Sequence, residues 1–135
     1  MFRTILTLTV FGLISTLASG AEGSSGRVFE LRTYTTFDGK LDALQKRFRD
    51  HTIEIFNRHG MTSIGYWVPQ DAPDSQNTLI YILAHPSRDA AKKAWADFQA
   101  DPEWQKVSAE SQKDGRIVTK VVSVFMDPTD YSAIK

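Results

Sequence analysis

The sequence predicts an α+β domain in which four strands form one antiparallel sheet and the helices lie on one of its faces. Four segments are rich in β-branched and aromatic residues, as strands are. Two longer segments carry apolar residues three and four positions apart, which is the helical period. One helical segment follows the first strand and the other follows the third. The order β-α-β-β-α-β is that of the ferredoxin-like sandwich.

The first predicted strand, residues 27–36 (RVFELRTYTT), alternates between two sets of side chains. One set is Phe29, Leu31 and Thr33, and the other is Glu30, Arg32 and Tyr34. If Phe29 and Leu31 pack on the helices, the polar set lies on the opposite face of the sheet, toward the interior of the dimer.

A long helix is predicted after the break at Asp38–Gly39 and extends to about His59, and Gly60 follows where a glycine commonly ends a helix. Its apolar positions are Leu41, Leu44, Phe48, Ile55 and Phe56. His51 lies in phase with this stripe, so we expect it to face the sheet.

Residues 61–68 (MTSIGYWV) and 77–85 (NTLIYILAH) are the second and third strands, joined by a polar turn. Tyr81 and His85 share one face of the third strand. Ser87 and Asp101 are the expected N-caps of two further helical segments, and Pro102 fits the first position of the second one. Residues 116–126 are the fourth strand, and residues 127–135 are a tail.

The third and fourth strands are apolar on both sides, although an antiparallel sheet with one solvated face alternates apolar and polar residues. One chain has only enough helix to cover one face. A second copy of the same sheet is the simplest cover for the other. We therefore expect a homodimer in which two sheets pack face to face as a dimeric α+β barrel.

Residues 1–20 have the pattern of a secretory signal peptide. Arg3 is their single charge, an apolar run of 13 residues follows, and small residues end the segment. Cleavage fits after Gly20 or after Ala21, and residues 21–26 would be a flexible linker to the domain at 27–126. An uncleaved anchor is the alternative, but a bilayer needs about 20 apolar residues. We expect a secreted or periplasmic protein with no stable membrane insertion after cleavage.

Composition excludes several classes of function. The 16 Lys and Arg residues balance 16 Asp and Glu residues, so nucleic acid is not an expected partner. The chain has no Cys, which excludes disulfides, thiol nucleophiles and thiolate metal sites. His51 and His59 are eight residues apart, unlike a helical zinc pair, and no phosphate-binding or serine-hydrolase motif is present. We expect neither a metal site nor a cofactor.

The candidate pocket or ligand-binding residues are polar groups on strands and one inward-facing histidine: Glu30, Arg32, Tyr34, His51, Tyr81 and His85. The row on the first strand is either an ion pair that sets register, or a pocket floor on which Arg32 binds an anionic group and Tyr34 donates a hydrogen bond. His51 is either a hydrogen-bonded core residue or a general base at the pocket edge.

Five stretches in order resemble the NIPSNAP family. They are FELRTYT (Phe29–Thr35), GKL (Gly39–Leu41), RHG (Arg58–Gly60), IGYW (Ile64–Trp67) and ADPEWQ (Ala100–Gln105). The resemblance implies a ferredoxin-like protomer in a dimeric barrel. The family has no settled biochemical activity, and its wider fold relatives include cofactor-independent monooxygenases, haem-degrading enzymes and small-ligand binders.

Two functional hypotheses follow. The first is an exported homodimer that binds a small, mainly apolar ligand in the barrel, since an apolar wall with a few polar groups is typical of ligand sites. The second is a cofactor-independent monooxygenase or isomerase acting on a small phenolic or enolic substrate. In it, Arg32 and Tyr34 would orient the substrate and His51 would take a proton.

Overall fold

The computed structural model describes residues 26–135 of the chain. The predicted signal peptide and residues 21–25 of the predicted linker lie outside this range. The strands are β1 (Val28–Thr36), β2 (Thr62–Trp67), β3 (Thr78–His85) and β4 (Val118–Met126). The helices are α1 (Leu41–Arg47), η1 (Phe48–Thr52), α2 (Ile53–Arg58), α3 (Arg88–Ala100) and α4 (Pro102–Ser111), and a short 3₁₀ turn, η2 (Asp74–Gln76), lies between β2 and β3.

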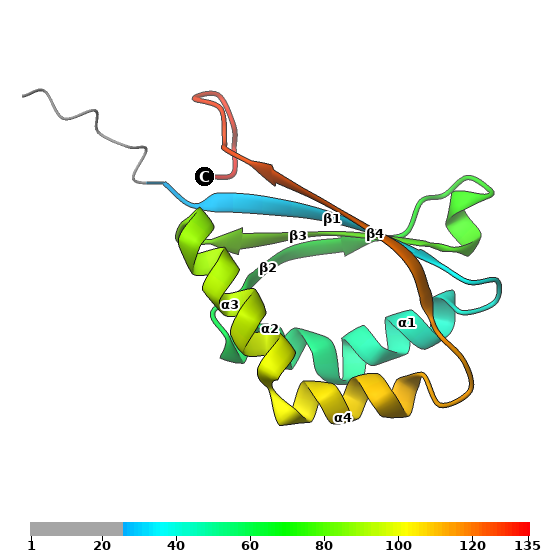
Figure 1. Cartoon of the computed structure of the whole chain (residues 1–135). Helices are drawn as coiled ribbons and strands as arrows, with labels where there is room; N and C mark the ends of the chain where they lie inside the picture. Colours follow the sequence, from blue (N-terminus) through cyan, green and yellow to red (C-terminus); the bar gives the residue numbers. More distant parts are fainter. Residues whose placement is uncertain (1–25) are drawn as a thin grey trace, which may run out of the picture.

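The four strands form one antiparallel sheet in the order β2-β3-β1-β4, and the helices lie on one face of it (Figure 1). This arrangement confirms the predicted α+β, ferredoxin-like topology. The apolar core fills the space between helices and sheet. Its fully buried members include Leu44, Ile55, Phe56, Leu83 and Phe98.

The first helical segment contains a π-helical turn that the sequence analysis did not foresee. The segments α1, η1 and α2 follow one another without a break, and the five residues of η1 have the π-helical hydrogen-bond pattern. Such a turn holds one extra residue and rotates the positions after it. Thr52 therefore points inward, 1% exposed, and its hydroxyl donates to the Arg47 carbonyl at 3.2 Å. The prediction that His51 faces the sheet was wrong, because His51 is exposed.

The helices α3 and α4 begin where the sequence predicts. The Ser87 hydroxyl accepts the Ala90 N–H at 3.0 Å and caps α3, while one oxygen of Asp101 accepts the Glu103 N–H at 2.8 Å and caps α4. The other Asp101 oxygen accepts from Arg58 at 2.8 Å and from His59 at 2.7 Å. The hydrogen bonds with Arg58, which has the larger effect, and with His59 lower the pKa of the Asp101 carboxyl. Asp101 thus joins the end of α2 to the start of α4.

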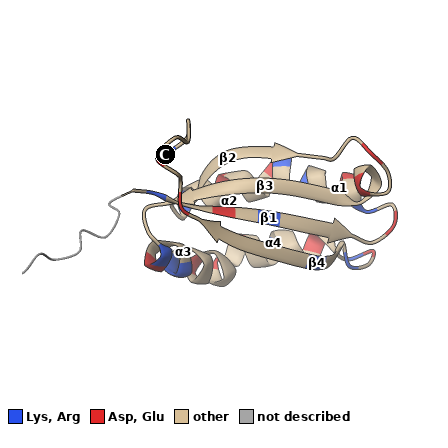
Figure 2. Cartoon of the chain, turned by 90° about the horizontal axis from the view of Figure 1, so that it is seen from above, with Lys and Arg blue, Asp and Glu red and all other residues tan. Residues whose placement is uncertain are grey.

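The face of the sheet away from the helices is open and apolar. Leu31 lies opposite Ile82 of β3 and Val124 of β4, so these side chains share that face. Figure 2 looks onto this face and shows few charged residues along the strands. Val124 is 46% exposed.

Residues 127–135 fold back beside one end of the open face. They line a cavity of about 310 Å³ together with apolar side chains of the sheet, among them Phe29, Ile64, Ile82 and Met126. The Arg27 guanidinium donates to the main-chain oxygen of Lys135. Within residues 26–135, none of the helices is both long and apolar enough to span a membrane.

Candidate functional site

The polar set of β1 faces the helices, not the open side of the sheet. Glu30 is opposite Leu83, and Tyr34 is opposite Leu79, which are both buried beneath the helices. The condition that Phe29 and Leu31 pack on the helices is therefore not met, and the polar set does not lie on the open face. Donors from β3, α3 and β4 satisfy the Glu30 carboxylate on the helix side.

Glu30 is the centre of that polar cluster. It is 1% exposed, and its two oxygens accept four hydrogen bonds. The donors are Arg32 Nη1 at 2.7 Å, Ser123 Oγ at 2.7 Å, Trp95 Nε1 at 2.7 Å and His85 Nε2 at 3.0 Å. Burial alone would raise the pKa of Glu30, but the hydrogen bonds outweigh it and lower the pKa to about 2.

The lowered pKa of Glu30 makes this residue one contributor to the acid stability of the domain. A carboxyl group whose pKa is lowered by folding contributes stability above its unfolded pKa, and that contribution is lost as the pH falls through the folded pKa. For Glu30 the window runs from about pH 4.5 down to about pH 2. We expect urea unfolding at a series of pH values to show a steeper loss of stability in this window for wild type than for Glu30→Gln. Parallel curves would contradict the assignment.

Arg32 connects Glu30 to two aromatic residues of the polar cluster. Its Nη2 donates to the Tyr34 hydroxyl at 3.2 Å, and its guanidinium carbon lies 4.1 Å from the centre of the Trp95 ring. The side chain keeps 15% exposure. Arg32 is therefore held by a carboxylate, a phenol and an aromatic face, while its Nε is buried and has no hydrogen-bond partner among the described residues.

An aromatic cluster adjoins these polar groups. Phe48 of η1 packs against Tyr34, Tyr66 and Tyr81, with ring centroids 5.9, 5.7 and 5.2 Å away. Tyr66 and Tyr81 are stacked at 5.4 Å. Tyr81 is fully buried, and burial raises its pKa well above the ordinary value. Its hydroxyl lies close to Tyr34 and Arg32 but makes no well-aligned hydrogen bond within residues 26–135.

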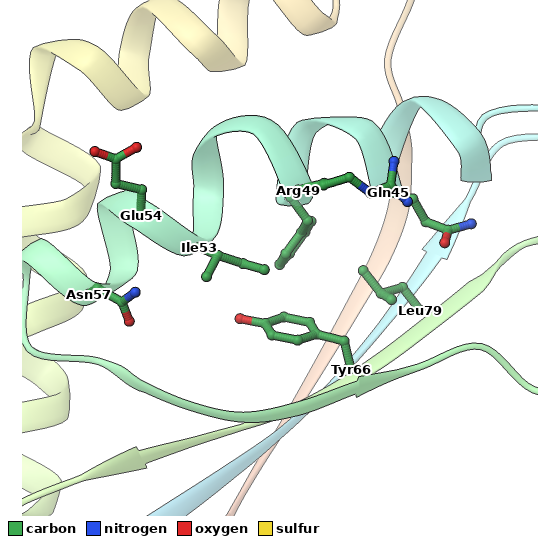
Figure 3. A pocket seen from close by; sticks show the side chains of 8 residues that line it. Gln45, Arg49, Ile53, Glu54, Asn57, Tyr66 and Leu79 are labelled. Atoms are coloured by element: carbon green, nitrogen blue, oxygen red, sulfur yellow. The ribbon is translucent and has the colours of Figure 1, made fainter.

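A groove of about 430 Å³ opens on the other side of Phe48 and Tyr66. Its apolar lining comes from Phe48, Ile53, Tyr66 and Leu79, and its polar lining from Gln45, Arg49, Glu54 and Asn57. In Figure 3 the Tyr66 ring lies across the groove from Ile53, with Leu79 beside it and Asn57 at the far end. The Tyr66 hydroxyl hydrogen-bonds Ser63 Oγ at 2.7 Å, and burial raises the pKa of this phenol.

The structure gathers five of the six predicted site residues on the helix side of the sheet. Glu30, Arg32 and Tyr34 lie there with Tyr81 and His85 from β3. His51 is not among them and lines a separate depression against α4.

Sequence reasoning missed the role of two partners of Glu30 and all of the groove. Neither Trp95 nor Ser123 was among the candidate site residues. Trp95 could have been noticed because its indole N–H needs an acceptor when buried. The groove combines surface positions of a helix with strand residues distant in sequence, so no local pattern marks it. Within residues 26–135, no cluster of three or more His, Asp or Glu side chains could hold a metal ion.

Comparisons with known proteins agree on the fold. The sequence profile of the NIPSNAP family matches residues 29–133, and no curated protein matches the chain. A crystal structure of a NIPSNAP family protein of unknown function from Agrobacterium tumefaciens is 26% identical, with a TM-score of 0.71 over 84% of this chain and 97% of that one.

Two oxygenases are more distant structural neighbours. SnoaB, a cofactor-independent oxygenase from Streptomyces nogalater, is 15% identical with a TM-score of 0.53, over 79% of this chain and 97% of that one. A monooxygenase from Streptomyces coelicolor, solved with the ligand nanaomycin D, is 15% identical with a TM-score of 0.54, over 80% of this chain and 92% of that one. At this identity the likeness concerns the fold alone.

Proposed function

The chain belongs to the NIPSNAP family, and on that premise we propose that it binds a small, mainly apolar ligand with a polar end in the groove between α1–α2 and β2. The groove itself carries this proposal. Its volume of about 430 Å³ lies in the range of about 300–1,000 Å³ that small-molecule sites occupy.

The lining suits a ligand with two chemical ends. Phe48, Tyr66 and Leu79 offer an aromatic and aliphatic wall, while Arg49 and Asn57 can hydrogen-bond polar atoms. The sequence predicted a ligand inside a dimeric barrel. We place it on the helix side of the sheet instead, because the groove lies there and the open face carries few polar groups.

We further propose that the protein is exported and acts as a homodimer. Export is supported by the signal-peptide pattern of residues 1–20. Dimerisation is supported by the open face, where Val122 and Val124 are 41% and 46% exposed. A second copy of this face would bury both apolar surfaces without covering the groove, which lies on the other side of the sheet.

The oxygenase hypothesis now needs a different base. His51 lines another depression, so the ionisable base available in the groove is the carboxylate of Glu54. The names of two structural neighbours favour testing it. Aerobic turnover of a panel of phenols and quinols that Glu54→Gln abolishes, with ligand binding retained, would support an enzyme. Absence of turnover by wild type would leave the binding function alone.

A bulky substitution tests the groove. Asn57 is an exposed α2 residue that lines it, so a tryptophan there fills the groove without entering the core. We expect Asn57→Trp to weaken binding of Nile red, a neutral fluorescent dye, by about tenfold or more, since the ring occupies the space of the ligand. Titration followed by dye fluorescence measures the effect.

Lys92→Trp is the matched control. Lys92 is also exposed on a helix, α3, and lines none of the described cavities. It adds the same surface tryptophan without filling the groove, so dye affinity should stay at the wild-type value. Equal losses in the two variants, or none in Asn57→Trp, would place the dye elsewhere and contradict the proposal.

A further inference from the structure

Arg47 is a buried cation without a carboxylate partner. It is 7% exposed, and the acceptor it has within the described chain is the Ser111 hydroxyl, at a long 3.3 Å from Nη1. Its Nε is buried and unpartnered, and its guanidinium lies over the Trp104 ring at 5.2 Å. An unpaired charge in the interior costs several kcal/mol, so this arrangement requires an explanation.

Arg32 belongs to the same region. Tyr34 and Tyr81 lie within electrostatic reach of both guanidinium groups. Of the two cations only Arg32 contacts a carboxylate, that of Glu30, whose oxygens already accept four hydrogen bonds. Three buried polar atoms in this region lack partners within residues 26–135: Arg32 Nε, Arg47 Nε and the Tyr81 hydroxyl. All three are hydrogen-bond donors when Tyr81 is protonated, and burial keeps it so.

We propose that Arg32, Arg47 and Tyr81 form a binding site for one carboxylate group, separate from the groove. One carboxylate carries the single negative charge that the cluster lacks. Its planar pair of oxygens matches guanidinium donors, which bind carboxylates through charge-assisted hydrogen bonds. The flanking rings of Tyr34, Trp95 and Trp104 favour an aromatic carboxylate over an aliphatic one.

A ligand reaches this site past β4, some of whose side chains on the helix side of the sheet are exposed. Val121 and Ser123 lie opposite Tyr34 and Arg32, so their side chains are on the helix side of the sheet. Val121 is nevertheless 44% exposed, and Ser123 is also exposed while donating to Glu30. Solvent therefore reaches the helix side of the sheet beneath this edge strand. Arg47 contacts α4, which contributes no residue to the groove.

Benzoate and its neutral analogue benzamide test the site. We expect benzoate to raise the melting temperature of the wild-type protein with the logarithmic concentration dependence of binding at one site, and benzamide to bind about tenfold more weakly, because the charge-assisted bonds are lost. Arg47→Met should bind benzoate about tenfold more weakly than wild type. Without ligand, its melting temperature should equal or exceed that of wild type, because an unpaired buried charge has been removed.

Lys46→Met is the matched control, because Lys46 adjoins Arg47 on α1, is exposed and lines none of the described cavities. It should keep wild-type affinity for benzoate, and Arg49→Met, which alters the groove, distinguishes the two sites. Loss in Arg49→Met alone would assign the carboxylate to the groove and overturn this site while leaving the proposed function intact. Equal binding of benzoate and benzamide, or no saturable benzoate binding by wild type, would also overturn it.

Tyr81→Phe provides a second variant that is safe for folding. It removes a hydroxyl that has no described partner and keeps the ring among Tyr34, Phe48 and Tyr66. Its stability should match or exceed that of wild type, and its benzoate affinity should be about tenfold lower. If Arg47→Met fails to fold, this variant decides the question, and unchanged affinity in Tyr81→Phe would then overturn the proposal.

Discussion

Replacing Glu30 with glutamine is expected to lower the free energy of unfolding by about 3–5 kcal/mol, the range seen when one partner of a buried ion pair is removed. Glu30 is 1% exposed and ties together β1, β3, α3 and β4. The glutamine amide has no negative charge to balance the Arg32 guanidinium. Its NH₂ group is a hydrogen-bond donor and lies where a carboxylate oxygen accepts hydrogen bonds in wild type. Urea unfolding followed by circular dichroism measures the loss.

Glu103→Gln is the comparison for this variant. Glu103 also forms an ion pair, with Arg58 at 2.8 Å, but its side chain is 51% exposed. Exposed pairs contribute little because water screens them, so the urea midpoint should hardly move. If the two substitutions had similar effects, Glu30 would not be the centre of the interior polar cluster.

Replacing Val124 with lysine is expected to convert the protein from a dimer to a monomer. Val124 lies on the open face beside Leu31, where a second copy would bury it. In the proposed dimer each protomer would bury one unpaired ammonium group, at a cost of several kcal/mol per ion. In the monomer the position is already 46% exposed, so folding should be preserved. Analytical ultracentrifugation at micromolar concentration reports the change in mass.

The same strand supplies the control. Val121 is 44% exposed, nearly the same as Val124, but it points to the helix side of the sheet. Val121→Lys should therefore remain a dimer. A wild-type protein that sediments as a monomer, or a dimer that survives in Val124→Lys, would contradict the proposed assembly.

The sequence was sufficient to predict the order and type of the elements. The strand and helix periods, the caps at Ser87 and Asp101 and the doubly apolar β3 all recur in the structure. These features depend on neighbours in the chain, which a sequence displays directly. The orientation of β1 does not depend on neighbours in the chain. It depends on hydrogen bonds that Glu30 accepts from Trp95 and Ser123, which are 65 and 93 residues away.

The prediction that His51 faces the sheet was wrong for a different reason. An uninterrupted α-helix would carry it to the sheet, but the π-helical turn adds a residue and brings Thr52 there instead. Residues 48–52 (FRDHT) carry no Pro or Gly that would mark the irregularity. The groove was unpredictable on similar grounds, because Asn57 and Arg49 read as ordinary solvated helix positions until β2 is placed beneath them.

The central claim is that a small ligand occupies the groove on the helix side of the sheet. Native mass spectrometry of the protein purified from its own host tests it most directly, with wild type and Asn57→Trp prepared in parallel. We predict that wild type retains one small molecule per protomer and that Asn57→Trp retains none, with both folded. A wild-type protein without bound mass, or an Asn57→Trp protein carrying the same ligand at the same occupancy, would contradict the claim.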